Sequence, residues 1–338
     1  MVETVTTPSN DIYTETITQI RLSKQHPTFN HTCIRVKDPV RSIKFYTEVL
    51  GMKLLSHKKF PDMKFDLYFL AFDNTPNVIK NESTVFYCSG VLELTHNYGT
   101  ESDPNFQVNN GNVEPYRGFG HVCFTCFDIE KLSSLLESQK VEFKKRLVDG
   151  RQKDIAFIYD PDHYWIELVC YGNRPNYIQE GEELITEDHG LKFNHTMLRV
   201  KDPKKSIEFY TNVFGMTLLE SKSHENAKFT VYFLGYLDKR EIGPRRMREG
   251  VLELTHNWGT EEDPDFHYHN GNDKPQGYGH ICVSLEDPGA FCKEITDKYS
   301  DEQIKWGVKF NQGKMKNLAF IKDPDNYSIE IVPHYLNV

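Results

Sequence analysis

The octapeptide GVLELTHN occurs twice in the chain, at Gly90–Asn97 and again at Gly250–Asn257. Working outward from it, FNHT at Phe29–Thr32 returns at Phe193–Thr196, and the motifs RVKDP, NGN, GH-x-C and DPD also recur in the same order. The offset between partners changes by only a few residues, as expected when only loops differ in length. The sequence therefore predicts two copies of one unit. The expected divisions are an arm (1–27), a first copy (28–172), a polar linker (173–190) and a second copy (191–338).

Each copy divides again into two modules with one plan. A module opens with a strand-like run that holds a His, continues with a helix, and closes with strands that end in a Glu. The openings read HTCIRV, HVCFTCF, HTMLRV and HICVSL, and the closings read VLELTH, YWIELV, VLELTH and YSIEIV. Alternation places Glu93 on the face opposite Leu92 and Leu94. The pattern β-α-β-β-β, four times over, predicts an α+β fold with two curved mixed sheets instead of a parallel doubly wound sheet.

The first helix is predicted from the residues at its ends. Asp38 is typical of an N-cap, Pro39 of the first helical position, and Gly51 of the residue after the last turn. The residues expected to share its apolar face are Val40, Ile43, Tyr46, Val49 and Leu50.

Composition narrows the class of protein. The 338 residues include 40 Lys+Arg and 49 Asp+Glu, which leave a net charge of −9. This acidic balance argues against a nucleic-acid partner, and the lack of an 18-residue apolar stretch argues against a membrane span. The Thr-rich start of the chain has no apolar signal core, and seven Cys is an odd number, so we expect a reduced, cytoplasmic protein. Cys123 and Cys126 form a C-x-x-C, but a strand would point them to opposite faces.

Four His and four Glu stand at matching positions of the four modules. The pairs are His31 with Glu93, His121 with Glu167, His195 with Glu253, and His280 with Glu330. A carboxylate inside an apolar strand is costly to bury without a charged partner. His and carboxylate are ligands for a borderline divalent metal, so the four pairs suffice for two His₂Glu₂ sites. His96 and His256 compete as ligands, and we rank them lower because the second and fourth modules have no counterpart.

These motifs resemble those of the glyoxalase I (lactoylglutathione lyase) family of the vicinal-oxygen-chelate superfamily, in its yeast-type tandem form. The matching motifs are H-T-x-x-R-V-K-D-P, L-E-L-T-H-N-W/Y-G-T-E, G-F/Y-G-H and D-P-D-x-Y-x-I-E, and they cover nearly all of residues 28–338. The resemblance implies that the four His and four Glu are metal ligands. Animal-type members carry Gln where this chain has His31 and His195, and nickel-dependent bacterial members carry His. The resemblance implies Zn²⁺, and the His shared with the nickel-dependent members keeps Ni²⁺, Co²⁺ and Fe²⁺ as alternatives.

The resemblance also implies how the modules pair. Single-copy family members share each active site between two subunits. If the fused chain keeps that exchange, it is a monomer with two sites, each built from both copies. The first site would be His31, Glu93, His280 and Glu330. The second site would be His121, Glu167, His195 and Glu253.

The reaction implied converts the hemithioacetal of methylglyoxal and glutathione into S-lactoylglutathione, which detoxifies methylglyoxal. A proton moves from C1 to C2 through an enediolate, whose charge a divalent metal stabilises as a Lewis acid. A carboxylate takes the proton and returns it to the neighbouring carbon. By position we expect Glu330 and Glu167 to be the bases, with Glu93 and Glu253 able to shuttle a proton on the opposite face.

Glutathione, the implied co-substrate, is anionic and needs cations and amide donors. For its γ-glutamyl end the resemblance implies Arg35 with Asn97, and Arg199 with Asn257. For its glycyl carboxylate it implies Arg117 and Lys145, both in the first copy. The second copy has Gln276 in place of the Arg and a shorter loop, with Lys309 or Lys314 as substitutes. Since Arg117 and Lys145 would serve the second site, we expect that site to bind glutathione conjugates more tightly.

The residues alone allow two other functions. A ring-cleaving dioxygenase would hold Fe²⁺ with two His and one carboxylate, and the second carboxylate of each site argues against it. A metal-dependent binding or sequestering protein of the same fold would need no base.

Overall fold

The computed structural model describes residues 25–73, 79–150, 152–171, 190–237 and 244–335. The predicted arm and linker lie almost wholly outside these ranges. Within the described ranges, no helix has both the length and the apolar character needed to cross a membrane.

Each of the four modules has one α-helix followed by three strands, with a fourth strand before the helix. The first module comprises β1 (Thr28–Val36), α1 (Pro39–Lys44), β2 (Lys53–Phe60), β3 (Phe65–Ala71) and β4 (Val91–Asn97). The second comprises β5 (Phe119–Cys126), α2 (Ile129–Ser138), β6 (Phe143–Lys145), β7 (Ile155–Tyr159) and β8 (Trp165–Cys170). The third comprises β9 (Lys192–Arg199), α3 (Pro203–Asn212), β10 (Thr217–His224), β11 (Phe229–Gly235) and β12 (Val251–Asn257). The fourth comprises β13 (Tyr278–Leu285), α4 (Pro288–Lys298), β14 (Lys305–Val308), β15 (Ala319–Lys322) and β16 (Ser328–Pro333).

Short helical turns join these elements. They are η3 (Phe45–Val49), which is π-helical and continues α1, and the 3₁₀ turns η4 (Pro61–Met63), η5 (Glu82–Thr84), η6 (Thr100–Ser102), η7 (Glu225–Ala227), η8 (Arg245–Met247) and η9 (Thr260–Glu262).

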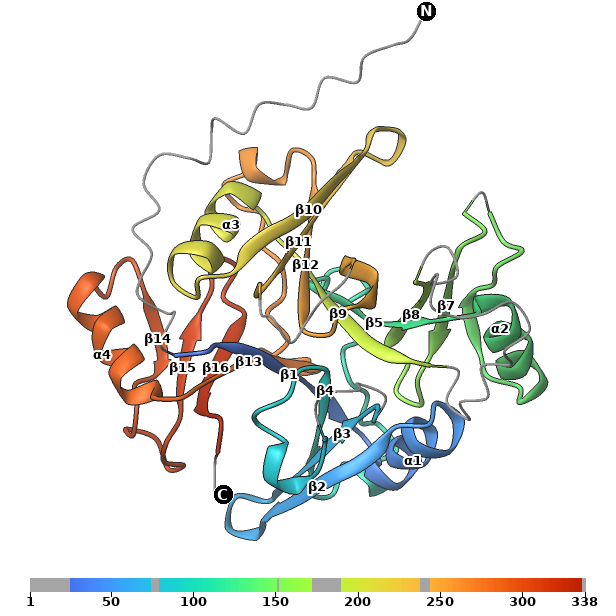
Figure 1. Ribbon diagram of the computed structural model, residues 1–338, viewed down its shortest axis with the longest axis horizontal. Helices are drawn as coiled ribbons and strands as arrows, with labels where there is room; N and C mark the ends of the chain where they lie inside the picture. Colours follow the sequence, from blue (N-terminus) through green and yellow to red (C-terminus); the bar gives the residue numbers. More distant parts are fainter. Residues whose placement is uncertain (1–24, 74–78, 151, 172–189, 238–243, 336–338) are drawn as a thin grey trace, which may run out of the picture.

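The strands form two eight-stranded mixed sheets, and each sheet joins one module from each copy. One sheet has the order β14-β15-β16-β13-β1-β4-β3-β2, and the other has the order β10-β11-β12-β9-β5-β8-β7-β6. β1 pairs with β4 of its own module in parallel and with β13 of the other copy antiparallel. Figure 1 shows this exchange, because the blue start of the described chain lies beside the orange and red strands of its end. The predicted fold class and module pattern are confirmed.

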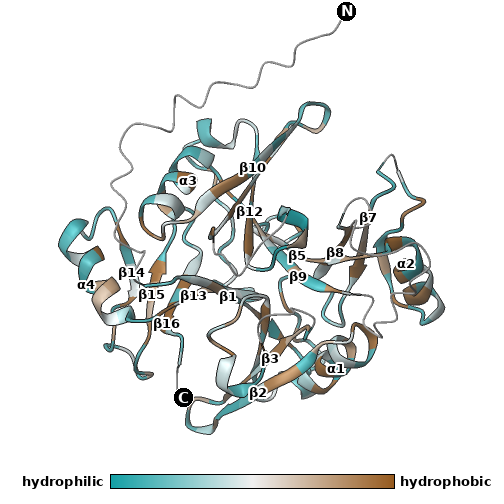
Figure 2. Ribbon diagram, in the orientation of Figure 1, coloured by the Kyte–Doolittle hydropathy of each residue, from teal (hydrophilic) through white to brown (hydrophobic). Residues whose placement is uncertain are grey.

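The helices cover one face of the sheets and build the main core with it. Tyr46 of η3, Leu136 of α2, Tyr210 of α3 and Ile295 of α4 are all fully buried there, together with every second residue of the central strands, such as Leu92. Figure 2 shows the apolar residues concentrated along these strands and helices. Because side chains alternate along a strand, Glu93 points to the opposite face, away from the helices.

The first helix begins as predicted but buries a narrower face. Asp38 Oδ1 accepts a hydrogen bond from the Val40 N–H at 2.9 Å, and Gly51 has a φ of +78°. Tyr46 and Leu50 are buried, whereas Val40 is 75% exposed, so its predicted place on the apolar face is wrong. At about 100° per residue, Val40 lies about 120° around the helix from Tyr46, which is outside the buried stripe.

The two copies also meet at a buried ion pair. Lys80 Nζ donates to both carboxylate oxygens of Glu249, at 2.8 and 2.7 Å, and both side chains are almost fully buried. Lys80 precedes η5 of the first copy, and Glu249 follows η8 of the second. Close by on the sheets, the Thr32 and Thr196 hydroxyls lie 2.5 Å apart. The pair therefore links the two loops that precede β4 and β12.

Candidate metal centres

The first group of ligating side chains lies on the central strands of one sheet. Nε2 of His31 is 3.0 Å from Oε2 of Glu93 and 3.2 Å from Nε2 of His280. Oε2 of Glu330 is 3.4 Å from the His31 nitrogen and 3.6 Å from the His280 nitrogen. The ligand atoms all lie within 4.8 Å of one another. The strands that bring them together are β1 and β4 of the first copy and β13 and β16 of the second.

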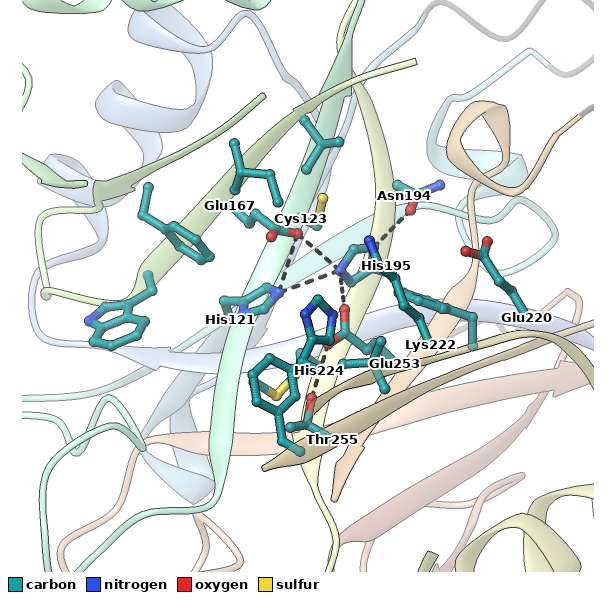
Figure 3. Close-up of a pocket in the computed structure, with 18 of the residues that line it drawn as sticks. His121, Cys123, Glu167, Asn194, His195, Glu220, Lys222, His224, Glu253 and Thr255 are labelled. Atoms are coloured by element: carbon teal, nitrogen blue, oxygen red, sulfur yellow. Dashed lines mark hydrogen bonds and ion pairs between the residues drawn. The ribbon is translucent and has the colours of Figure 1, made fainter. Parts of the chain in front are cut away.

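The second group repeats this arrangement in the other sheet (Figure 3). Nε2 of His195 is 2.9 Å from Oε2 of Glu253, 3.3 Å from Oε2 of Glu167 and 3.4 Å from Nε2 of His121. His121 is in turn 3.5 Å from Glu167. Both groups thus combine two copies in the pairing that the sequence resemblance implied. We call them the first tetrad (His31, Glu93, His280, Glu330) and the second tetrad (His121, Glu167, His195, Glu253).

Strand register explains why these side chains converge. In the parallel pair of β1 and β4, Cys33 lies opposite Glu93, and His31, two residues earlier, shares the face of Cys33. The same offset recurs between His280 and Glu330, since Cys282 lies opposite Glu330. A period of two therefore places all four ligands on the sheet face that the helices leave uncovered.

An Asn orients one His of each tetrad, His31 in the first and His195 in the second. Asn30 Nδ2 donates to the carbonyls of Val85 and Cys88, so its Oδ1 accepts the proton of His31 Nδ1 at 2.7 Å. Asn194 holds His195 Nδ1 at 2.8 Å in the same way. A proton fixed on Nδ1 leaves the lone pair of Nε2 facing the tetrad. Sequence reasoning missed this role, although the Asn before each of these His in the repeated FNHT was the available signal.

The hydrogen-bonding groups of each tetrad are mostly acceptors, which fits a bound cation. With Nδ1 of His31 protonated, its Nε2 is an acceptor, and it faces the carboxylate oxygens of Glu93 and Glu330, which are acceptors too. Buried acceptors that face one another need protons or a cation between them. Imidazole and carboxylate are together a suitable set for a borderline divalent metal. The residues present therefore fit a metal ion.

The His side chains favour the ionised form of the carboxylates in both tetrads. Burial acts to raise the pKa of Glu93 and of Glu253, but the close contact with the neighbouring His outweighs it and lowers the pKa below its usual value. The pKa of Glu330 and that of Glu167 are lowered too, again against burial, by His280 and His121 respectively. Two negative charges per tetrad match the charge of one divalent ion.

A cavity of about 330 Å³ opens over the second tetrad. Arg117, Arg199 and Asn257, three of the residues predicted to bind glutathione, line it with the tetrad. Arg199 is 7% exposed, and its guanidinium donates to Asn112 Oδ1 at 2.8 Å and to the carbonyl of Phe119 at 3.0 Å. Burial first and the Arg117 charge second lower the pKa of Arg199. Two guanidiniums thus converge at one end of the cavity.

Lys145 lies behind the cavity wall and is not among the residues that line it. Its Nζ donates to the carbonyls of Gln152 and Ile155, at 2.7 and 2.6 Å, and these two residues do line the cavity. Asn257 donates to the Tyr268 hydroxyl at 2.9 Å.

Around the first tetrad the predicted substrate residues are arranged less favourably for an anion. Arg35 donates to Asn272 Oδ1 at 2.8 Å, which repeats the contact of Arg199, and Asn97 ends β4 as Asn257 ends β12. At the position of Arg117, Gln276 donates to the Asn272 carbonyl instead. Lys309 pairs with Asp301 at 3.2 Å, and Lys314 is exposed.

The competing ligands lie elsewhere. His96 bonds to Glu101 at 2.7 Å and His256 bonds to Glu261 at 2.6 Å, and neither belongs to a tetrad. Cys123 and Cys126 both lie on β5 and are buried, and no disulfide joins them.

Comparison with known proteins places this geometry in a family. A family model described as the Glyoxalase/Bleomycin resistance protein/Dioxygenase superfamily matches residues 28–168 and 192–331. The glyoxalase I of Saccharomyces cerevisiae is 59% identical over 322 residues, which are 94% of this chain and 96% of that protein. The chain belongs to the glyoxalase I family.

Two further similar proteins support this family assignment. The lactoylglutathione lyase of Schizosaccharomyces pombe is 47% identical over 304 residues, which cover 90% of this chain and 95% of that protein. The crystal structure of glyoxalase I from Zea mays has a TM-score of 0.68 at 28% identity, and the match covers 92% of this chain and 93% of that one. The glyoxalase I family is metal-dependent, and the two tetrads are this chain's candidate ion-binding groups.

Proposed function

We propose that the chain is a lactoylglutathione lyase. It isomerises the hemithioacetal of methylglyoxal and glutathione to S-lactoylglutathione at two metal-dependent sites. The observation that carries this proposal is the pair of buried His₂Glu₂ tetrads, each with an Asn-oriented His, in a chain 59% identical to a glyoxalase I.

Each tetrad would hold one divalent ion, with Zn²⁺ as the first candidate and Ni²⁺, Co²⁺ or Fe²⁺ as alternatives. When bound, the ion supplies Lewis-acid stabilisation of the negative charge that develops on the substrate oxygens. The residues that would hold it are His31, Glu93, His280 and Glu330 in one site, and His121, Glu167, His195 and Glu253 in the other.

Glu330 and Glu167 are the proposed bases. A carboxylate oxygen accepts the proton from C1 of the substrate and delivers it to C2, so the reaction is a net isomerisation with no other reactant. Glu93 and Glu253 are less suited, because the hydroxyls of Thr95 and Thr255 donate to them at 2.9 and 3.0 Å. Within each tetrad the proposed base is also the more exposed carboxylate, with 10% against 4% in the first tetrad and 11% against 8% in the second.

The glutathione part of the substrate would bind at the end of the cavity where Arg199 and Arg117 lie. Arg199, Arg117 and Asn257 offer charged and amide donors to its carboxylates there. Arg35 and Asn97 would do the same at the first tetrad. The second site has the additional cation of Arg117, which supports tighter binding of glutathione conjugates at that site.

A single chain would suffice for activity, because all eight tetrad ligands come from one molecule. Family members that share a site between subunits need two chains for this purpose. We therefore propose an active monomer. Size-exclusion chromatography with light scattering, run at the concentration of the activity assay, would show the mass of one chain.

The test of the proposed function uses the purified full-length chain. We expect one divalent ion per tetrad by elemental analysis and thioester formation from methylglyoxal and glutathione. Removal of the metal with a chelator should abolish turnover, and addition of Zn²⁺ should restore it. The matched control is the double variant Glu167→Gln/Glu330→Gln. Turnover that survives complete metal removal, or a metal-loaded chain without turnover, would contradict the proposal.

A further inference from the structure

The loops before β4 and β12 occupy equivalent places beside the two tetrads. Asn30 donates to the carbonyls of Val85 and Cys88, and Asn194 donates to those of Arg245 and Arg248. This shared bonding pattern matches Val85 with Arg245, and therefore Phe86 with Arg246. The two loops thus place different chemistry at one structural position.

At the first tetrad this position is apolar and closely packed. Phe86 is 3% exposed, and its ring centroid lies 6.1 Å from that of His31 and 5.3 Å from that of Phe69. Val85 and Phe86 belong to a cluster on the tetrad face of the sheet, which we call the apolar wall. Its members include Phe69, Val85, Phe86, Cys282, Leu318 and, partly buried, Met315.

At the second tetrad the same position is cationic. The Arg245 guanidinium lies 3.6 Å from the ring centroid of Phe233, and that ring contacts His195 with a centroid distance of 5.5 Å. Arg245 Nε also donates to Glu220 at 2.7 Å. Arg246 and Lys222 line the cavity as well, and Figure 3 shows Lys222 and Glu220 on the His195 side of the tetrad. We call Arg245 and Arg246 the basic wall. Lys222 is not part of it, because Lys58 holds the matching place on β2 of the first copy.

Both walls lie on the side of the tetrad away from the residues proposed to bind glutathione. Arg199 follows His195 by four residues along β9, which separates their Cα atoms by about 13 Å. The loop that carries Arg245 is bonded instead to Asn194, on the other side of His195. With the reacting carbons at the tetrad and glutathione toward Arg199, the group left to face the basic wall is the side chain of the 2-oxoaldehyde.

We propose that the two sites divide 2-oxoaldehydes by side-chain chemistry. The first site takes hemithioacetals with an apolar or aromatic side chain, which packs on the apolar wall. The second site takes those with an anionic side chain, which pairs with the basic wall. Val85 and Phe86, against Arg245 and Arg246, are the specificity-determining residues. The inference rests on the proposed function and deepens it by naming the substrate class of each site.

The physical reason is the cost of a mismatched wall. A carboxylate beside Phe86, Val85 and Leu318 would lose its hydration without gaining a cation. A phenyl group beside Arg245 and Arg246 would displace water from charged side chains and would bury less apolar surface than on the apolar wall. Methylglyoxal, which carries only a methyl group, suits both walls and serves as the common reference substrate.

The first experiment compares the single-site chains Glu167→Gln, which keeps the first site, and Glu330→Gln, which keeps the second. Each is assayed with the glutathione hemithioacetals of phenylglyoxal and of 4,5-dioxopentanoate, with methylglyoxal as the reference. We expect the phenylglyoxal to dioxopentanoate ratio of kcat/KM to be about tenfold or more higher in Glu167→Gln. Inhibition of the same two chains by S-benzylglutathione and S-(2-carboxyethyl)glutathione should rank in the same order.

The second experiment exchanges the walls. In the Glu330→Gln chain, Arg245→Val with Arg246→Phe should shift the ratio toward phenylglyoxal. In the Glu167→Gln chain, Val85→Arg with Phe86→Arg should shift it toward dioxopentanoate. Lys293→Gln, an exposed residue of α4 that pairs with Asp297, is the control for loss of a positive charge and should leave the ratio unchanged.

The outcomes separate the two proposals. If neither single-site chain turns over methylglyoxal, the proposed function fails. If both turn it over but show equal ratios and equal inhibitor ranking, the division of substrates is wrong while the function stands. The inhibitor ranking needs no wall variants, so the proposal remains testable even if the exchanged walls do not fold.

Discussion

Around His31 and around His195 the chain builds the same inner structure with different surroundings. Both His donate their Nδ1 proton to the side-chain oxygen of the preceding Asn, and both face a second His and two carboxylates from the other strands. Beyond the tetrads, nine buried residues form the apolar cluster at the first site, whereas the corresponding cluster at the second has three, and a cavity with five Arg and Lys side chains opens there. The tetrads depend on strand register and resist change, whereas the wall residues that differ, Val85 and Phe86 against Arg245 and Arg246, come from loops that can change independently.

The largest expected effect tests whether the tetrads are equivalent. Replacement of one proposed base, in Glu167→Gln or Glu330→Gln, should lower kcat/KM at the altered site about 10²–10⁴-fold, because the proton acceptor is lost. Each single variant keeps the activity of the other tetrad, and the double variant falls to background. Steady-state kinetics with methylglyoxal checks this. A double variant that keeps more than a few per cent of the activity would show that another group is the base.

The next effect concerns the ion pair where the two site loops meet. Lys80→Met leaves the Glu249 carboxylate buried without the Lys80 ammonium, and should lower the free energy of unfolding by about 3–5 kcal/mol. Lys80→Met/Glu249→Leu removes both charges and should recover most of the loss. Denaturant titration measures both.

The exposed pair of Lys53 with Asp73 is the control for that experiment. Lys53→Met should cost about 1 kcal/mol or less, because water screens the pair. Equal losses in Lys80→Met and Lys53→Met would mean that the buried pair does not hold the two loops together.

A smaller effect compares the two Asn residues that orient His31 and His195. Asn30→Leu and Asn194→Leu should each weaken metal affinity at one tetrad about 10–100-fold, because the His loses the acceptor that fixes its tautomer. Competition with a chelator of known affinity would show one tight and one weak ion in each variant. Two ions still bound with unchanged affinity would contradict the role assigned to the Asn.

The smallest effect concerns glutathione. Arg117→Gln should raise KM at the second site up to about tenfold, the range of one charge-assisted hydrogen bond. The effect is limited because Arg117 is 38% exposed and pairs with Glu114. Gln276→Arg is the reciprocal change and should lower KM at the first site. The measurements use the single-site chains, and equal KM values before any change would remove the expected inequality between the sites.

Much of the fold could be predicted because it follows from local periodicity. The alternation of side chains around Glu93 predicts which face of the sheet Glu93 occupies. The repeated pattern from His to Glu predicts the four modules. Which modules pair could not be derived from spacing, since a His and a Glu in each of four modules allow several assemblies. The cross-copy choice came from family resemblance, and the structure brings the same residues together.

Other features had no periodic signal. Arg245 and Arg246 stand in the segment GPRRMREG, where nothing in the sequence indicates that a cavity lies beside it. Lys145 looked like an anion-binding residue by its motif, but its ammonium is engaged with backbone carbonyls. The pairing of Lys80 with Glu249 joins residues 169 positions apart, and only the assembled sheets create it.

The strand order also determines when each tetrad can assemble during synthesis of the chain. The strands of the second sheet, β5 to β12, form one continuous stretch of the chain, so the second tetrad can assemble once residue 257 has left the ribosome. β1 emerges among the first described strands, yet its neighbour β13 starts only at Tyr278, and the first tetrad must wait for Glu330. An unpaired strand edge is prone to non-native association during that delay. Nascent chains halted after β12 should therefore already contain one complete centre, while the edge of β1 still depends on a chaperone or on the remaining modules.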